Sequence, residues 1–152
     1  MEFSEFLKDN YESVEKRVKE VSNKLLGIPY QHNGRTQEGV DCLGLVYLFF
    51  RELGVEFPVD DKRGYIAEDW YKTEPDRYIA GLRNIGVEVG HFRDLQILDI
   101  PYFTLYKNVI THTGVMIDRQ HFIHILTDKK VSIDGFERRF WRAKYAGGRR
   151  LF

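Results

Sequence analysis

The chain contains a single cysteine, and that residue is the one best suited to covalent chemistry. Cys42 follows Asp41 directly and opens an apolar segment that runs to Gly54. A cysteine reacts as its thiolate, which the first turn of a helix favours through the helix dipole and unpaired backbone N–H groups. The same N–H groups can hold the oxyanion of a tetrahedral intermediate. Position alone leaves open that Cys42 is a small buried hydrophobic residue.

The histidines supply the base that a cysteine nucleophile needs to accept its proton. Three of the five, His112, His121 and His124, lie in strand-like sequence on either side of a turn. If residues 118–120 form a three-residue loop, Gly114 pairs with His124, and His112 then shares a face with His124. A two-residue loop would place the two rings on opposite faces. We therefore interpret Cys42 as the nucleophile, His112 as its base and His124 as the residue that orients the base. The alternative is that the two histidines are ordinary strand residues without a catalytic role.

A metal site is a competing interpretation of the histidines. His121 and His124 alternate to opposite faces of one strand, and the chain has no HExxH or CxxC spacing. We therefore expect neither a metal ion nor another cofactor.

The composition describes an ordinary globular domain. Hydrophobic residues make up 43% of the 152 residues and charged residues 30%, and the 23 basic side chains equal the 23 acidic ones. Such a chain has no overall field that draws it to nucleic acid or to an anionic membrane, so we expect neither as a partner. We predict one domain over residues 1–152, in which the weakly periodic residues 58–94 form a lid or an insertion.

The compartment is predicted from three features. The first ten residues are charged and lack the apolar segment of a secretion signal. No apolar stretch is long enough to cross a bilayer, and one cysteine cannot form an intramolecular disulfide. These features favour a cytoplasmic location.

Two helices are predicted before the strands begin. Residues 10–26 carry valine and leucine at helical spacing, and Gly27 is placed to end that helix. Residues 42–53 are apolar nearly all round and are closed by Gly54, which is typical of a buried central helix.

Residues 96–134 are rich in β-formers and are predicted to hold at least three antiparallel strands. Residues 136–145 are interpreted as a further strand, followed by a basic tail at residues 147–150. The expected fold is α+β, with the central helix packed on the antiparallel sheet.

Three blocks of sequence carry a family resemblance. They are Gly27-Ile28-Pro29-Tyr30, then Gly39-Val40-Asp41-Cys42-Leu43-Gly44-Leu45-Val46, and then His112-Thr113-Gly114-Val115-Met116-Ile117-Asp118 with Phe122-Ile123-His124. Together they resemble the NlpC-type papain-like cysteine peptidases over about residues 22–134. The resemblance implies a papain-like fold in which Cys42 is the nucleophile, His112 the base and His124 the third polar residue.

The resemblance also implies a class of substrate. Members of the family typically cleave γ-D-glutamyl–diamino-acid bonds in cell-wall peptides, and an Asp–Ser pair flanking the nucleophile binds the free amino end of the peptide in some of them. Asp41 matches that pattern, but Leu43 replaces the serine, which resembles the phage-tail-associated branch. Leu98-Asp99 replaces the usual Gly-Asp pair. Tyr30 is expected to line the site, with a plain packing role as the alternative.

The expected activity is therefore hydrolysis of an amide bond, through a thioester acyl-enzyme, in a small peptide or peptidoglycan fragment. Two alternatives stay open: an acyltransferase of the same fold, and a catalytically degenerate binding module of a phage tail or adaptor. A phage origin would make phage tail proteins the partners and the virion the location.

Overall fold

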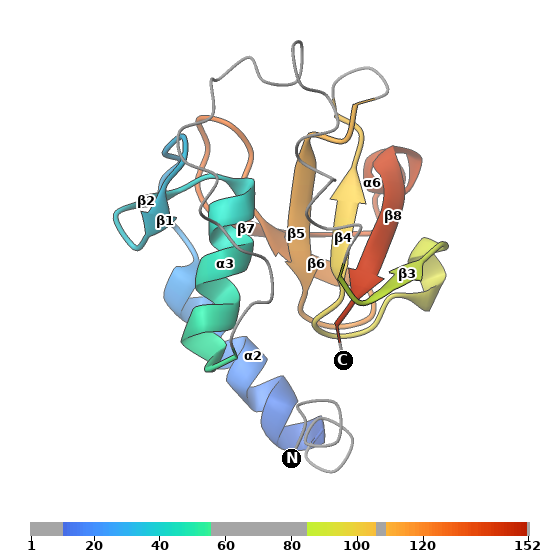
Figure 1. The fold of residues 1–152 in the computed structure, drawn as a ribbon, viewed down its shortest axis with the longest axis horizontal. Helices are drawn as coiled ribbons and strands as arrows, with labels where there is room; N and C mark the ends of the chain where they lie inside the picture. The colour runs from blue at the N-terminus through green and yellow to red at the C-terminus, as the bar shows by residue number, and fades with distance from the viewer. Residues whose placement is uncertain (1–10, 56–84, 106–108, 152) are drawn as a thin grey trace.

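The computed structural model describes residues 11–55, 85–105 and 109–151. Its elements follow in chain order, and Figure 1 shows their arrangement. They are α2 (Tyr11–Leu25), β1 (Arg35–Thr36), β2 (Gly39–Val40), α3 (Cys42–Leu53), β3 (Val87–Val89), the 3-10 helix η1 (Phe92–Asp94), β4 (Ile100–Phe103), β5 (His112–Met116), β6 (His121–His124), β7 (Ser132–Gly135), α6 (Arg139–Lys144) and β8 (Tyr145–Arg150).

A six-stranded antiparallel sheet forms the centre of the described fold, with the strand order β3-β8-β4-β5-β6-β7. The helices α2 and α3 lie together on one side of it, and β1 pairs with β2 as a separate hairpin just before α3. This arrangement confirms the predicted α+β fold.

The first helix has the apolar face that its sequence predicts. Its buried side chains recur every three or four residues, at Val14, Val18, Val21 and Leu25. Gly27 ends the helix region with a φ of 87°, in the left-handed conformation that glycine adopts without a steric penalty. One face of α2 is thereby committed to the core.

The central helix α3 begins at Cys42 and ends at Leu53, as predicted. Gly54 caps it with a φ of 87°, and its N–H donates to the carbonyls of Phe50 and Arg51. Most of its side chains are buried. Within the described residues, neither α3 nor any other helix has the length and apolarity to cross a membrane.

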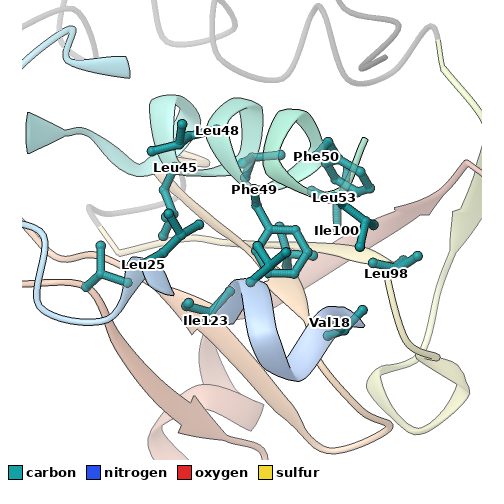
Figure 2. Close-up of a cluster of buried hydrophobic side chains, with 14 of the residues drawn as sticks. Val18, Leu25, Leu45, Leu48, Phe49, Phe50, Leu53, Leu98, Ile100 and Ile123 are labelled. Atoms are coloured by element: carbon teal, nitrogen blue, oxygen red, sulfur yellow. The ribbon is translucent and has the colours of Figure 1, made fainter. Parts of the chain in front are cut away.

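The main core joins the two helices to the sheet. Figure 2 shows side chains of α3, such as Leu45 and Phe49, in one cluster with Val18 and Leu25 of α2 and Ile123 of β6. Each fully buried side chain of this size contributes roughly 1.5–3 kcal/mol of burial free energy. The cluster therefore fixes α3 against the sheet.

The β5–β6 hairpin has the predicted register. Gly114 pairs with His124, and the N–H of Ile117 donates to the carbonyl of His121, so residues 118–120 form a three-residue loop. Because paired residues share a face, His112 and His124 point to the same side of the sheet.

A second, smaller core lies on that side, and we call it the aromatic cluster. Its buried members are Val89, Leu95, Phe103, Met116, Phe122, Phe136 and Trp141. The six-residue helix α6 contributes Trp141, which is 2% exposed. The two histidines are therefore surrounded by aromatic side chains and not by the aliphatic side chains of α3.

The prediction of a strand over residues 136–145 was wrong. Residues 139–144 form α6, and the supposed basic tail is the strand β8, which lies between β3 and β4. The aromatic residues gave the segment a strand-like composition, but packing of Trp141 into the aromatic cluster favours a helical turn. Gly147 and Gly148 give β8 a sequence that does not resemble a strand. Gly147 is nevertheless required, because a Cβ there would clash with the ring of Tyr102.

An ion pair ties β8 to the start of β4. Arg150 donates to both carboxylate oxygens of buried Asp99, at 3.1 and 2.8 Å, and Asp99 also accepts the N–H of Gln96. Burial raises the pKa of Asp99 even though Arg150 opposes this shift. The aspartate of the Leu98-Asp99 pair therefore has a structural role.

The predicted lid lies mainly outside the described residues. Residues 58–84 belong to the undescribed part, so a lid there stays a prediction. The remaining part of that segment includes β3, which pairs with β8 at the edge of the sheet, and η1.

Candidate active site

The start of α3 is held by Asp41. Its Oδ1 atom accepts the N–H of Gly44 at 2.7 Å, and its Oδ2 atom accepts the N–H of Asn33 at 3.0 Å. A Cβ at Gly44 would collide with the carbonyl oxygen of Gly34. The glycine is thus explained by the close approach of the preceding loop, and the N-terminal end of α3 has a defined position.

The half-buried thiol of Cys42 lies against the strand that carries His112. Its Sγ atom is 3.9 Å from the carbonyl oxygen of Thr111, the residue directly before β5. The sulfur therefore lies at the N-terminal end of β5, against the backbone of the residue that precedes His112. This contact confirms that the central helix brings its N-terminal end to the start of β5.

The two predicted histidines are in direct contact. The Nε2 atom of His112 lies 2.8 Å from the Nδ1 atom of His124, which is hydrogen-bonding distance. Their exposed fractions are only 3% and 1%. One ring must donate and the other accept, so each histidine limits the position of the proton on its neighbour.

Aromatic rings enclose this pair. The ring centroid of Trp141 is 4.9 Å from that of His124 and 5.7 Å from that of His112, and Phe103 lies 5.7 Å from His112. Burial among these rings lowers the pKa of His112 well below 6.5, and the neighbouring His124 adds to the shift. His112 is consequently neutral at pH 7 and able to accept a proton.

His124 is neutral for the same reason. Burial lowers its pKa to about 4, although the carboxylate of Asp134 opposes the shift. The Nε2 atom of His124 is 3.6 Å from Oδ2 of Asp134, and Arg138 donates to both oxygens of that carboxylate at 3.0 and 3.2 Å. The histidine pair therefore continues into an ion pair at the surface.

Asp134 was not found by sequence reasoning. In β7 it pairs with Phe122, while His124 pairs with Ser132, so the carboxylate is diagonal to the histidine on the same face. Only the register of the β6–β7 hairpin could have revealed this neighbour, and the sequence patterns did not specify that register.

The predicted substrate-binding residues lie near the nucleophile. Tyr30 forms a bridge with Val40, two residues before Cys42, and its N–H donates to the carbonyl of Lys129. Its half-buried side chain packs against the main core. The roles of Tyr30 and Asp41 toward a substrate stay predictions.

Across residues 11–55, 85–105 and 109–151, no three His, Cys, Asp or Glu side chains are grouped so as to hold a metal ion.

The sequence profile of the NlpC/P60 family matches residues 27–150. The chain belongs to the NlpC/P60 family. Two relatives of this NlpC/P60 chain are named for cell-wall activities. The probable peptidoglycan endopeptidase LytE of Bacillus subtilis is 27% identical over 128 residues, which are 84% of this chain and 31% of LytE. The murein DD-endopeptidase MepS/murein LD-carboxypeptidase of Escherichia coli K12 is 26% identical over 126 residues, 82% of this chain and 56% of that protein.

Solved structures of NlpC/P60 proteins share the fold. An NlpC/P60 family protein from Bacillus cereus has a TM-score of 0.66 at 22% identity, over 90% of this chain and 40% of that one. The NlpC/P60 domain of the peptidoglycan hydrolase SagA has a TM-score of 0.60 at 12% identity, over 90% and 98%. The peptidoglycan hydrolase RipB of Mycobacterium tuberculosis has a TM-score of 0.61 at 17% identity, over 95% and 67%. These matches confirm the papain-like fold that the sequence resemblance implied.

None of these NlpC/P60 relatives is described as a phage protein. The resemblance to the phage-tail-associated branch therefore stays a prediction, as does the cytoplasmic location.

Proposed function

We propose that the chain is a cysteine peptidase that hydrolyses an amide bond in a peptidoglycan-derived peptide. Cys42 is the nucleophile, His112 its base and His124 the orienting residue. The observation that carries this proposal is the buried 2.8 Å contact between His112 of β5 and His124 of β6, because Thr111, directly before His112, has its carbonyl oxygen 3.9 Å from the Cys42 sulfur. The names of LytE and MepS, both peptidoglycan or murein endopeptidases, support the substrate class.

The reaction proceeds in two steps. His112 takes the proton of the Cys42 thiol, and the sulfur attacks the amide carbon to form a tetrahedral oxyanion. The C–N bond breaks as His112 returns its proton to the leaving amine, which leaves a thioester on Cys42. Water then loses a proton to His112 and attacks the thioester, so that a carboxylic acid departs and the thiol is restored.

The oxyanion is held at the beginning of α3. The N–H groups of Gly44 and Leu45 already donate to Asp41, at 2.7 and 2.9 Å. The donors for the oxyanion therefore lie nearer the start of the helix, where the helix dipole also favours negative charge. The hydroxyl of Tyr30 is the candidate for a further donor.

Asp41 is the candidate for binding a free amino end of the substrate. Each of its oxygens accepts one backbone N–H, but an ionised carboxylate offers about four acceptor sites, so an ammonium group can still bind. Leu43 is buried and presents no hydroxyl. Recognition of the amino end consequently depends on Asp41 and not on an Asp–Ser pair.

The test is incubation of the purified chain with defined muropeptides, followed by mass spectrometry of the products. Cleavage by the wild-type chain that is lost in Cys42→Ala supports the proposal. Transfer of the acyl group to an added amine in preference to water would assign an acyltransferase instead. Binding of the muropeptide without turnover would assign a degenerate binding module.

A further inference from the structure

The catalytic base has two possible proton arrangements, and the contact between the histidines does not by itself choose between them. In one, Nε2 of His112 donates to Nδ1 of His124, and Nδ1 of His112 carries a lone pair. In the other, Nδ1 of His124 donates to Nε2 of His112, and the His112 proton moves to Nδ1. Only the first arrangement leaves His112 able to accept the proton of Cys42, since its other ring nitrogen is occupied by His124.

The surroundings of Nε2 of His124, the ring nitrogen that faces away from His112, distinguish the two proton arrangements. His124 is 1% exposed, and within the part of the chain that the structure describes its Nε2 atom has no hydrogen-bond partner. A buried polar nitrogen without a partner is unusual in proteins. Its neighbour is the carboxylate of Asp134, with Oδ2 at 3.6 Å, slightly beyond hydrogen-bonding distance.

We propose that Asp134 is a positioning residue that sets the ring tautomers of both His124 and His112. An ionised carboxylate only accepts hydrogen bonds, so the proton of His124 stays on Nε2, facing Asp134. Nδ1 of His124 is then an acceptor, and His112 must donate to it from Nε2. The lone pair of His112 is thereby fixed on Nδ1, the nitrogen left for the thiol. This inference rests on the proposed roles of Cys42 and His112.

Asp134 is itself held in place. Its two oxygens accept hydrogen bonds from Nη1 of Arg138 at 3.0 and 3.2 Å, and Oδ1 also accepts the N–H of Gly135. Its side chain is 16% exposed, whereas that of Arg138 is 63% exposed. Arg138 holds the carboxylate in its orientation, while its own charge opposes a positive charge on His124.

The test is long-range ¹H–¹⁵N NMR of the imidazole rings at pH 7, which reports which nitrogen of each histidine carries the proton. In the wild-type chain both His112 and His124 should be protonated on Nε2 alone. A wild-type His112 that carries its proton on Nδ1 overturns the proposal without any variant.

Asp134→Ala should shift His124, and with it His112, toward protonation on Nδ1. Asp134→Glu, which restores a carboxylate, should recover part of the wild-type pattern. The matched control is Asp118→Ala. Asp118 also contacts a histidine, His121 at 3.0 Å, but it lies in the loop of the β5–β6 hairpin, outside the proposed site. Unchanged tautomers in a folded Asp134→Ala chain would refute the role of Asp134.

Kinetics separate this inference from the proposed function. Asp134→Ala should lower kcat by about tenfold or more with little change in KM, since a wrong tautomer removes the base and not the substrate contacts. If the wild-type chain is active but its kcat and histidine tautomers are unchanged in Asp134→Ala, this inference is refuted and the proposed function is not. If the tautomers change in Asp134→Ala but the wild-type chain has no hydrolase activity, the proposed function is refuted and this inference is not.

Discussion

Nε2 of His112 and Nδ1 of His124 lie 2.8 Å apart in a pair that is almost completely buried. The pair exists because the loop at residues 118–120 has an odd number of residues, which places both rings on one face of the β5–β6 hairpin. His112 directly follows Thr111, whose carbonyl oxygen lies 3.9 Å from the Cys42 sulfur.

The histidines should differ in how much activity depends on them. His112→Ala should abolish hydrolysis almost completely because it removes the base, whereas His124→Ala should leave a measurable fraction because it removes only the orienting group. His121→Ala is the matched control, since that ring lies in the same strand β6 but pairs with Asp118 at the surface. Equal losses in His121→Ala and His112→Ala, measured as kcat/KM on a muropeptide, would argue against these roles.

The acid limb of the pH–rate profile should fall below pH 6.5. Burial lowers the pKa of His112, so the free enzyme keeps its neutral base to a lower pH than an exposed histidine would. The measurement is kcat/KM between pH 4 and 8. An acid limb at or above pH 6.5 would show that His112 is not the titrating base.

Stability should decrease as the pH falls from 6.5 toward 4. The pKa of His124 is about 4 in the folded chain against 6.5 in the unfolded chain, so between these values only the unfolded state binds the proton. This difference amounts to about 3 kcal/mol of lost unfolding free energy by pH 4, and the lowered pKa of His112 acts in the same direction.

Urea unfolding at several pH values tests this prediction. His124→Gln should reduce the pH dependence between 4 and 6.5, because one of the two buried titrating histidines is gone. His91→Gln provides the control, since His91 is exposed on the N-terminal side of η1. A wild-type chain whose stability is constant over this range would contradict the buried neutral pair.

Gly44→Ala should destabilise the chain by roughly 1–3 kcal/mol, the usual cost of overpacking. The new methyl group would collide with the Gly34 carbonyl, a backbone atom that cannot rotate away. Gly90→Ala is the control, because a Cβ there meets nothing within 4 Å. Chemical denaturation that shows no difference between the two variants would refute the tight packing of α3 on the preceding loop.

The parts of the fold that sequence predicted are those with strong local signals. Gly27 and Gly54 marked the ends of both helices because each adopts the left-handed conformation there. The β5–β6 register followed from loop parity together with the face shared by Gly114 and His124. These features depend on residues in the same turn or hairpin, whose backbone preferences can be predicted from the local sequence.

The parts that sequence missed depend on strand pairing and packing that no local pattern specifies. β8 has a glycine-rich sequence without alternation, and it is a strand because β3 and β4 pair with both of its edges. Trp141 lies beside both histidines only because α6 turns it into the aromatic cluster. Asp134 reaches His124 through the β6–β7 register. The strands that pair with β8 lie far from it in sequence, and no local pattern specified the β6–β7 register or the helix that carries Trp141, so these contacts were not predicted.

The most direct test of the account is detection of the acyl-enzyme on Cys42. The wild-type chain is mixed with a muropeptide, quenched in acid within one turnover and measured by intact and tandem mass spectrometry. We predict a mass increase equal to the acyl part of the substrate, located on Cys42, removed by hydroxylamine and absent in His112→Ala. Hydrolysis that persists in Cys42→Ala, or an adduct on another residue, would contradict the central claim.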